Sequence, residues 1–159
     1  MTWDFLSSTT LTEAGDTIDS GTIQAKKTLF VQVFGIATGN LDACVIRFNG
    51  STSGYSIRKD NDGDGGSTNT NENGINYMSA NASQNHYADF QIMNIDGEPK
   101  ILIDRTVRDG GSGAGSPPSR KVMLGKWTGT DQITQIQVVN RDGSGSYNTN
   151  SYLNVFGSD

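Results

Sequence analysis

The sequence is poor in the residues that build disulfides and metal centres. It has one cysteine and one histidine in 159 residues. Cys44 has no partner for an intramolecular disulfide, and its place in an alternating apolar run predicts a small buried side chain rather than a reactive thiol. We expect His86 to be an exposed, inert residue at the start of a strand, because a zinc site needs more His or Cys ligands than the chain offers.

Long apolar runs and blocks of basic residues are also missing. No segment approaches the roughly 20 apolar residues that span a bilayer, and residues 1–21 lack the basic start and apolar run of a signal peptide. The 12 Lys and Arg are scattered and outnumbered by 17 Asp and Glu, which gives a formal net charge of -5. We therefore expect a soluble protein made in a cytoplasm, with neither nucleic acid nor a membrane as partner.

Hydrophobic residues make up only 33% of the chain, whereas glycine is abundant at 20 residues. So much glycine indicates many tight turns and therefore short strands. No stretch of a dozen residues has apolar positions three and four apart, so no amphipathic helix is expected. We predict one all-β domain over residues 1–159, a jelly-roll-like β-sandwich of about eight to ten antiparallel strands.

Runs of β-branched and aromatic residues mark the expected strands. They are Thr2–Leu11, Thr17–Ile23, Thr28–Ala37, Asp42–Asn49, Tyr55–Lys59, His86–Ile95, Lys100–Val107, Val122–Trp127, Ile133–Asn140 and Ser151–Phe156. In residues 28–37 both alternating sets are largely apolar, so this strand should be buried on both faces or nearly so. Glycines in residues 49–54 predict one hairpin, and Asp96-Gly97 predicts a second. The last three strands should form a meander or parts of a Greek key.

Two segments of low complexity, residues 60–74 and 109–119, contain no residue that could anchor a core. Each lies between expected strands, so we interpret both as surface loops at the ends of the sandwich. Loops of this length are often functional.

The first loop holds three alternating carboxylates, Asp60, Asp62 and Asp64, followed by Gly65. This DxDxDG pattern is typical of calcium loops, because a hard cation prefers oxygen ligands and the glycine permits a sharp turn. The twelfth position, Asn71, is not the usual bidentate glutamate. The segment is therefore either a weak calcium site or, more simply, a solvated acidic turn. No other cofactor is indicated.

Several longer segments resemble a known family. They are WDFLSSTTLTEAGDTID near the start, FGIATGNLDACVIRFNGSTSGYSIR in the middle, and KWTGTDQITQIQVVN and YLNVFGSD late in the chain. The middle segment contains RFN-x-(S/T)-x-x-x-Y, formed by Arg47, Phe48, Asn49 and Tyr55, and the late one contains DQIT. In these segments the chain resembles a family of small virion structural proteins of tailed bacteriophages.

The resemblance implies a jelly-roll or related β-sandwich that assembles on the virion and has no catalytic residues. We therefore expect a virion protein, made in the cytoplasm of the bacterial host, that acts as a capsid cement or decoration protein. Its partners would be the major capsid protein and itself, as a dimer or trimer. The alternative is a carbohydrate-binding module of a tail or head fibre. An enzyme is not expected, although two of the 17 carboxylates could serve a glycoside hydrolase.

Two groups of residues are candidates for the capsid or self interface. Trp3 and Phe5 belong to an amino-terminal segment that either pairs with a neighbour's sheet edge or forms an edge strand of its own chain. Four basic residues border the second loop, where they either meet acidic residues of the shell protein or are ordinary solvated strand ends. They are Arg105, Arg108, Arg120 and Lys121.

Aromatic residues could instead form a sugar-stacking platform, although core and interface positions are the simpler interpretation. The exception is Tyr147, which lies among Gly, Ser and Asn and is expected to be exposed.

Overall fold

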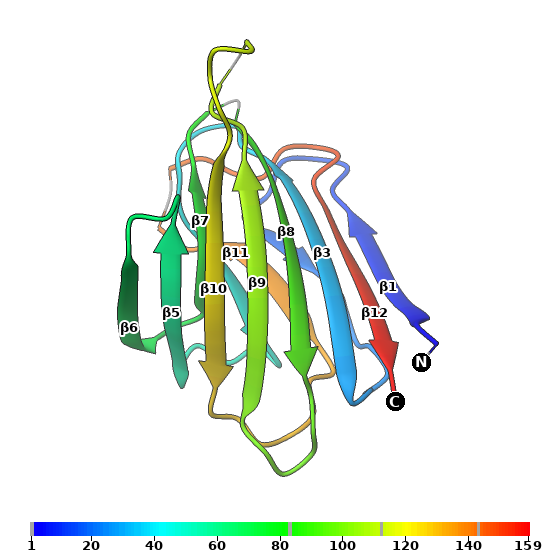
Figure 1. Ribbon diagram of the computed structural model, residues 1–159. Coiled ribbons are helices and arrows are strands. Elements are labelled where there is room, and N and C mark those ends of the chain that lie inside the picture. Colours follow the sequence, from blue (N-terminus) through cyan, green and yellow to red (C-terminus); the bar gives the residue numbers. More distant parts are fainter. Residues whose placement is uncertain (1, 83, 112, 143) are drawn as a thin grey trace.

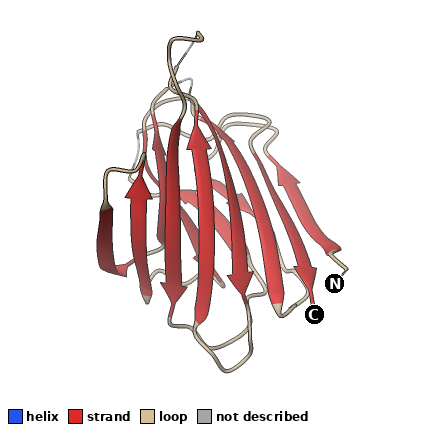
Figure 2. Cartoon of the chain, in the orientation of Figure 1, coloured by secondary structure: helices blue, strands red, loops and turns tan. Residues whose placement is uncertain are grey.

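Two antiparallel sheets face each other in the structure, a computed structural model that describes residues 2–82, 84–111, 113–142 and 144–159 (Figure 1). Over these residues the chain forms twelve strands and no helix (Figure 2). The predicted all-β sandwich is therefore confirmed. No helix able to cross a membrane occurs in the described part of the chain.

The larger sheet has eight strands in the order β1-β12-β3-β8-β9-β10-β5-β6. Their bounds are β1 Asp4–Thr10, β12 Tyr152–Ser158, β3 Thr28–Ile36, β8 Asn85–Met93, β9 Lys100–Arg108, β10 Ser119–Trp127, β5 Tyr55–Asn61 and β6 Gly66–Glu72. The smaller sheet has four strands in the order β2-β11-β4-β7. Their bounds are β2 Thr17–Asp19, β11 Ile136–Asn140, β4 Leu41–Phe48 and β7 Ile75–Ala80.

Eight of the strands follow the order of a jelly roll. The half-sheet β1-β12-β3-β8 lies opposite β2-β11-β4-β7, so that the chain alternates between the two sheets as in two Greek keys. The remaining strands, β5, β6, β9 and β10, are two inserted hairpins that add on beside β8. The insertions widen one sheet only, which gives the molecule a broad outer face over β8, β9, β10 and β5 (Figure 1).

The core lies between the sheets and follows the two-residue period of each strand. In β3, Leu29, Val31 and Val33 are fully buried. Phe30 and Phe34 point to the other face and are partly buried, so this strand is fully buried on one face and in part on the other. The outward set of β3 is apolar because it packs against aromatic residues of β12. Phe30 contacts Phe156, and Phe34 stacks on Tyr152.

One of the two predicted hairpins exists. β8 and β9 pair from His86 with Arg108 to Met93 with Ile101, which confirms the turn at Asp96-Gly97. The hairpin predicted at residues 49–54 is wrong, because β4 pairs with β7 and β11 whereas β5 pairs with β6 and β10. This segment crosses between the sheets. Likewise, β11 lies in the smaller sheet and β10 and β12 in the larger, so the Greek-key alternative holds and the meander does not.

The prediction of a loop over residues 60–74 is also wrong. β5 continues to Asn61 and β6 covers Gly66–Glu72, so the segment is a hairpin, with positive φ angles at Asp62, Gly63 and Gly65 in its turn. The edge strand β6 is formed by backbone pairing with β5 rather than by buried side chains. By contrast, residues 109–118 contain no strand over their described part and project beyond the sandwich (Figure 1).

Candidate functional site

The outer face of the larger sheet carries a row of side chains that crosses seven strands. Cross-strand pairing aligns Arg58, Leu124, Ile103, Gln91, Phe30, Phe156 and Phe5. A shorter neighbouring row contains Ile101 and Met93, which are paired with each other across β9 and β8. No described element of the chain covers this face (Figure 1).

We call the apolar part of this face over β8, β9 and β10 the apolar surface. It consists of Met93, Ile101, Ile103 and Leu124, whose exposed fractions are 52%, 52%, 50% and 54%. These side chains line a depression of about 500 Å³. Scattered exposed apolar residues are normal on a soluble protein, whereas a contiguous group marks an interaction site.

Aromatic residues extend the same face toward the sheet edge at β1. Trp3 lies 6.0 Å from Phe30 and Phe5 lies 5.7 Å from Phe156, both measured between ring centroids. Both Trp3 and Phe5 remain substantially exposed. The amino-terminal segment pairs with β12 of its own chain, so it is an intramolecular edge strand. A second depression of about 450 Å³ is lined by Trp3, Phe30, Gln32, Gln91, Arg105 and Phe156.

The four basic residues predicted near the second loop fall on two different faces. Arg105 and Arg120 point outward, beside the apolar surface, whereas Arg108 and Lys121 lie at inward positions. Side chains alternate between the two faces of a strand, so residues an even number of positions apart share a face. Arg108 therefore lies on the same face as the buried Leu102, and Lys121 on the same face as the buried Met123. The sequence alone does not show which set faces inward, because the outward positions of β9 hold Ile101, Ile103 and Val107 whereas most of its inward positions are polar or charged.

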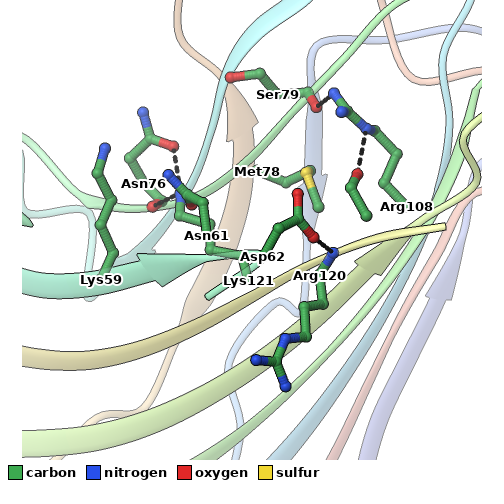
Figure 3. Close-up of a pocket in the computed structure, with 10 residues that line it drawn as sticks. Lys59, Asn61, Asp62, Asn76, Met78, Ser79, Arg108, Arg120 and Lys121 are labelled. Carbon is green, nitrogen blue, oxygen red and sulfur yellow. Dashed lines mark hydrogen bonds between the residues drawn. The ribbon is translucent and has the colours of Figure 1, made fainter. Parts of the chain in front are cut away.

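The inward pair lines a pocket between β5, β7, β9 and β10, here called the basic pocket (Figure 3). Its volume is about 310 Å³. The lining residues are Lys59, Asn61, Asp62, Asn76, Met78, Ser79, Arg108, Ser119, Arg120 and Lys121. Arg120 contributes its backbone, because its guanidinium points away from the other labelled side chains (Figure 3). Sequence reasoning missed Lys59 and Asn76, since nothing in the sequence places β5 and β7 beside Lys121.

Lys121 is the most buried cation of the pocket, with 8% of its surface exposed. Its Nζ donates to the backbone oxygen of Asn76 at 2.8 Å. Among the described residues, no carboxylate lies within 4.0 Å of this nitrogen. Burial, together with the charge of Lys59, lowers the pKa of Lys121 from 10.5 to about 8.

Arg108 is held in place by neutral partners. Its Nε donates to the hydroxyl of Ser119 at 3.2 Å, and its Nη1 donates to the backbone oxygen of Ser79 at 2.8 Å (Figure 3). These bonds fix the orientation of the guanidinium, and no carboxylate oxygen of the described residues lies within 4.0 Å of it.

The three carboxylates of the predicted calcium loop do not converge. Asp60 accepts a hydrogen bond from the backbone of Gly63 at 2.9 Å, and Asp62 accepts one from the backbone of Arg120 at 2.7 Å. No group of three or more His, Cys, Asp or Glu side chains in the described part of the chain could hold a metal ion. The geometry therefore gives no support to a calcium site at Asp60, Asp62 and Asp64. It shows an acidic hairpin turn that docks on β10.

Two residues expected to be exposed are buried in one interior cluster. Tyr147 has no exposed surface, because its backbone bridges to Gly15 and Ala37 and its hydroxyl lies 3.4 Å from that of Tyr77. His86 is 1% exposed, and its Nε2 lies 3.3 Å from the same Tyr77 hydroxyl. Both predictions of exposure are therefore wrong, and burial lowers the pKa of His86 to about 4.

Cys44 belongs to the same interior region and is fully buried, as predicted. Burial raises the pKa of its thiol to about 11, so the thiolate needed for nucleophilic chemistry is absent at neutral pH.

Comparison with known proteins assigns no family. No protein-family model matches the chain, and no curated protein matches it.

Proposed function

We propose that the chain is a capsid cement or decoration protein of a bacteriophage virion, which docks on the major capsid protein through the outer face of its eight-stranded sheet. The observation that carries this proposal is the uncovered apolar surface, whose four side chains are each at least half exposed. A contiguous exposed apolar surface of this kind supports protein binding, because apolar side chains form the buried centre of protein interfaces. The resemblance to small virion structural proteins supplies the kind of partner.

Charges beside the apolar surface favour an acidic partner. The outward positions of β5, β9 and β10 hold four basic residues and one carboxylate, Asp60, although the whole chain is acidic. The basic residues are Arg58, Arg105, Arg120 and Lys126. Arg105 is already paired with Asp89 at 2.9 Å, which leaves three basic side chains for a partner. A shell surface with an apolar centre and acidic rim complements this face.

Binding of this protein would stabilise the capsid shell through mass action. A protein that binds the assembled shell and not its free subunits stabilises the shell by RT ln(1 + [L]/Kd) for each site, and many symmetric copies multiply the effect. The docking face consists of regular strands, with nine-residue pairing between β9 and β10, so little chain entropy is lost on binding. Self-association as a dimer or trimer would bring neighbouring copies into the same lattice.

The test combines composition and binding. Quantitative mass spectrometry of purified particles should give a copy number equal to that of the major capsid protein or a simple fraction of it. The double variant Ile103→Ser/Leu124→Ser should fold but lose cosedimentation with shells that lack the protein, by at least about tenfold in affinity. Val139→Ser, in the smaller sheet, is the control and should bind normally. Absence from particles, normal binding by the double variant, or self-association on this face without shell binding would overturn the proposal.

The aromatic end of the same face favours a second candidate function, a carbohydrate-binding module of a tail or head fibre. The rings of Trp3, Phe30 and Phe156 line one depression together with the amides of Gln32 and Gln91. Aromatic rings stack on the apolar face of a sugar, and amides bind its hydroxyls. Host glycan binding that Trp3→Ala abolishes, with only a few copies per particle, would support this function. Failure of the protein to bind host glycans would exclude this second candidate function.

A further inference from the structure

The basic pocket gathers positive charge that forms no ion pair with the carboxylates of the described residues. Lys59, Arg108 and Lys121 reach it from three different strands. Over the described residues none of these side chains lies within 4.0 Å of a carboxylate oxygen. Ion pairs do form elsewhere in this acidic chain, at Lys26, Arg105 and Arg141, so a shortage of carboxylates does not explain the gap.

We propose that the basic pocket binds a carboxylate group carried on a polar ligand of the size of a sugar acid. A buried ammonium without a counter-ion is costly, and an entering anion offsets that cost. The volume of about 310 Å³ accommodates a single sugar ring or an acidic side chain. Three further lining residues offer amide or hydroxyl groups for the ligand's own hydroxyl groups. They are Asn61, Asn76 and Ser119.

Among the described residues that line the pocket, Asp62 is the one acidic residue, and it limits the charge of the ligand. Asp62 holds its carboxylate at the pocket wall, where Oδ1 accepts a hydrogen bond from the backbone of Arg120 (Figure 3). This carboxylate opposes a second negative charge on a ligand, so a monoanion fits better than a phosphate dianion.

Proton uptake should accompany binding, because an anion beside Lys121 favours its charged form. The charged and titratable groups that influence this ammonium come from three strands, namely Lys59 on β5, Asp104 on β9 and Cys44 on β4. Lys59 disfavours the charged form, and a bound carboxylate reverses that influence. With the pKa of free Lys121 near 8, affinity is expected to fall as the pH rises from 7 through 9.

The experiment titrates the intact chain with glucuronate, while NMR follows the backbone amides and calorimetry follows heat and proton uptake. Glucuronate should shift the amides around Asn76, Arg108 and Lys121, and glucose, the neutral analogue, should not. Lys121→Met should weaken binding by at least about tenfold and remove the proton uptake. The matched control is Lys126→Met, an exposed lysine on the outward side of the same strand, which should bind as the wild type does.

A second variant and a second ligand complete the test. Lys59→Gln removes a charge from the pocket without touching the buried Lys121, so it should also weaken binding. A glutamate-containing peptide distinguishes a partner's side chain from a free sugar acid as the source of the carboxylate. Equal shifts with glucose and glucuronate, or unchanged affinity in both pocket variants, would overturn the proposal. The inference is independent of capsid docking, because the pocket lies on the inner side of the sheet.

Discussion

Gly35 of β3 and His86 of β8 are directly paired, and the imidazole ring of His86 occupies the space that a β-carbon on Gly35 would fill. Both residues point into the core. The glycine is therefore required by packing and not by backbone conformation, since its φ angle is ordinary.

We expect Gly35→Ala to destabilise the fold by about 1–3 kcal/mol, because the added methyl group forces the His86 ring to move within a packed core. The measurement is the midpoint of urea unfolding. Gly15→Ala is the control, because a β-carbon there has no neighbour within 4 Å, and its stability should change little. Equal unfolding midpoints for wild type and Gly35→Ala would show that the ring is free to move.

Acid should destabilise the protein through His86. Burial, followed by the charge of Arg108, lowers its pKa from 6.5 to about 4, while Asp109 acts in the opposite direction. Between pH 6.5 and 4 the unfolded chain therefore binds more protons at this residue than the folded chain does, so stability falls as the pH falls. The full loss is about 3 kcal/mol for this one group.

The test compares the wild type with His86→Gln, whose stability should depend less steeply on pH between 6.5 and 4. The difference between the two proteins isolates the histidine from Asp104, whose buried carboxyl has a raised pKa and responds to acid with the opposite sign. Parallel pH profiles for the two proteins would contradict a neutral buried His86.

The sequence predicts the class of fold because apolar alternation marks most strands that face the core. β6 escapes this reasoning because its residues from Gly66 to Glu72 are glycine or polar, so backbone pairing with β5 forms the strand without a buried apolar set. The segment 49–54 has the glycines of a hairpin, but Phe48 and Tyr55 belong to different sheets. A hydrogen bond connects them, in which the backbone N–H of Phe48 donates to the hydroxyl of Tyr55 at 2.9 Å. Turn residues determine how a chain bends and not which strand it pairs with next.

The candidate sites were predictable to a similar extent. The basic residues around the second loop are visible in the sequence, and their division between two faces follows from strand period. The partners contributed by β5 and β7 depend on long-range pairing, which no local pattern contains. The DxDxDG pattern left a calcium site and a solvated acidic turn open, and the geometry favours the turn, since Asp60 and Asp62 accept hydrogen bonds from backbone amides.

A second buried lysine, Lys100, should be essential for stability. Its Nζ donates to the backbone oxygens of Ile95, Glu98 and Thr130 at 2.5–2.7 Å, which ties the β8–β9 turn to the segment after β10. Lys100→Met leaves three carbonyl groups without this donor, and we expect a loss of about 3 kcal/mol or more. Hydrogen exchange should speed up at Gly97, whose amide donates to Thr130. Unchanged exchange and an unchanged unfolding midpoint would show that water replaces the ammonium.

Lys121, unlike Lys100, should lower the stability of the folded protein when it is charged. Its Nζ has one close carbonyl partner and no counter-ion among the described residues. Its pKa is lowered from 10.5 to about 8, so between these values the unfolded chain binds the proton more readily than the folded chain does. Wild-type stability should therefore rise as the pH increases from 8 to 10.5, by up to about 3 kcal/mol from this group.

Lys121→Met lacks this contribution, so it should be at least as stable as the wild type at pH 7, and the advantage should disappear as the pH approaches 10.5. Thermal unfolding at several pH values measures both effects, with Lys126→Met as the control that keeps the wild-type profile. A Lys121→Met protein that is clearly less stable than the wild type at pH 7 would mean that the bond to Asn76 outweighs the cost of burying the charge. Greater stability, combined with lost carboxylate binding, would mean that the chain retains this lysine for its ligand.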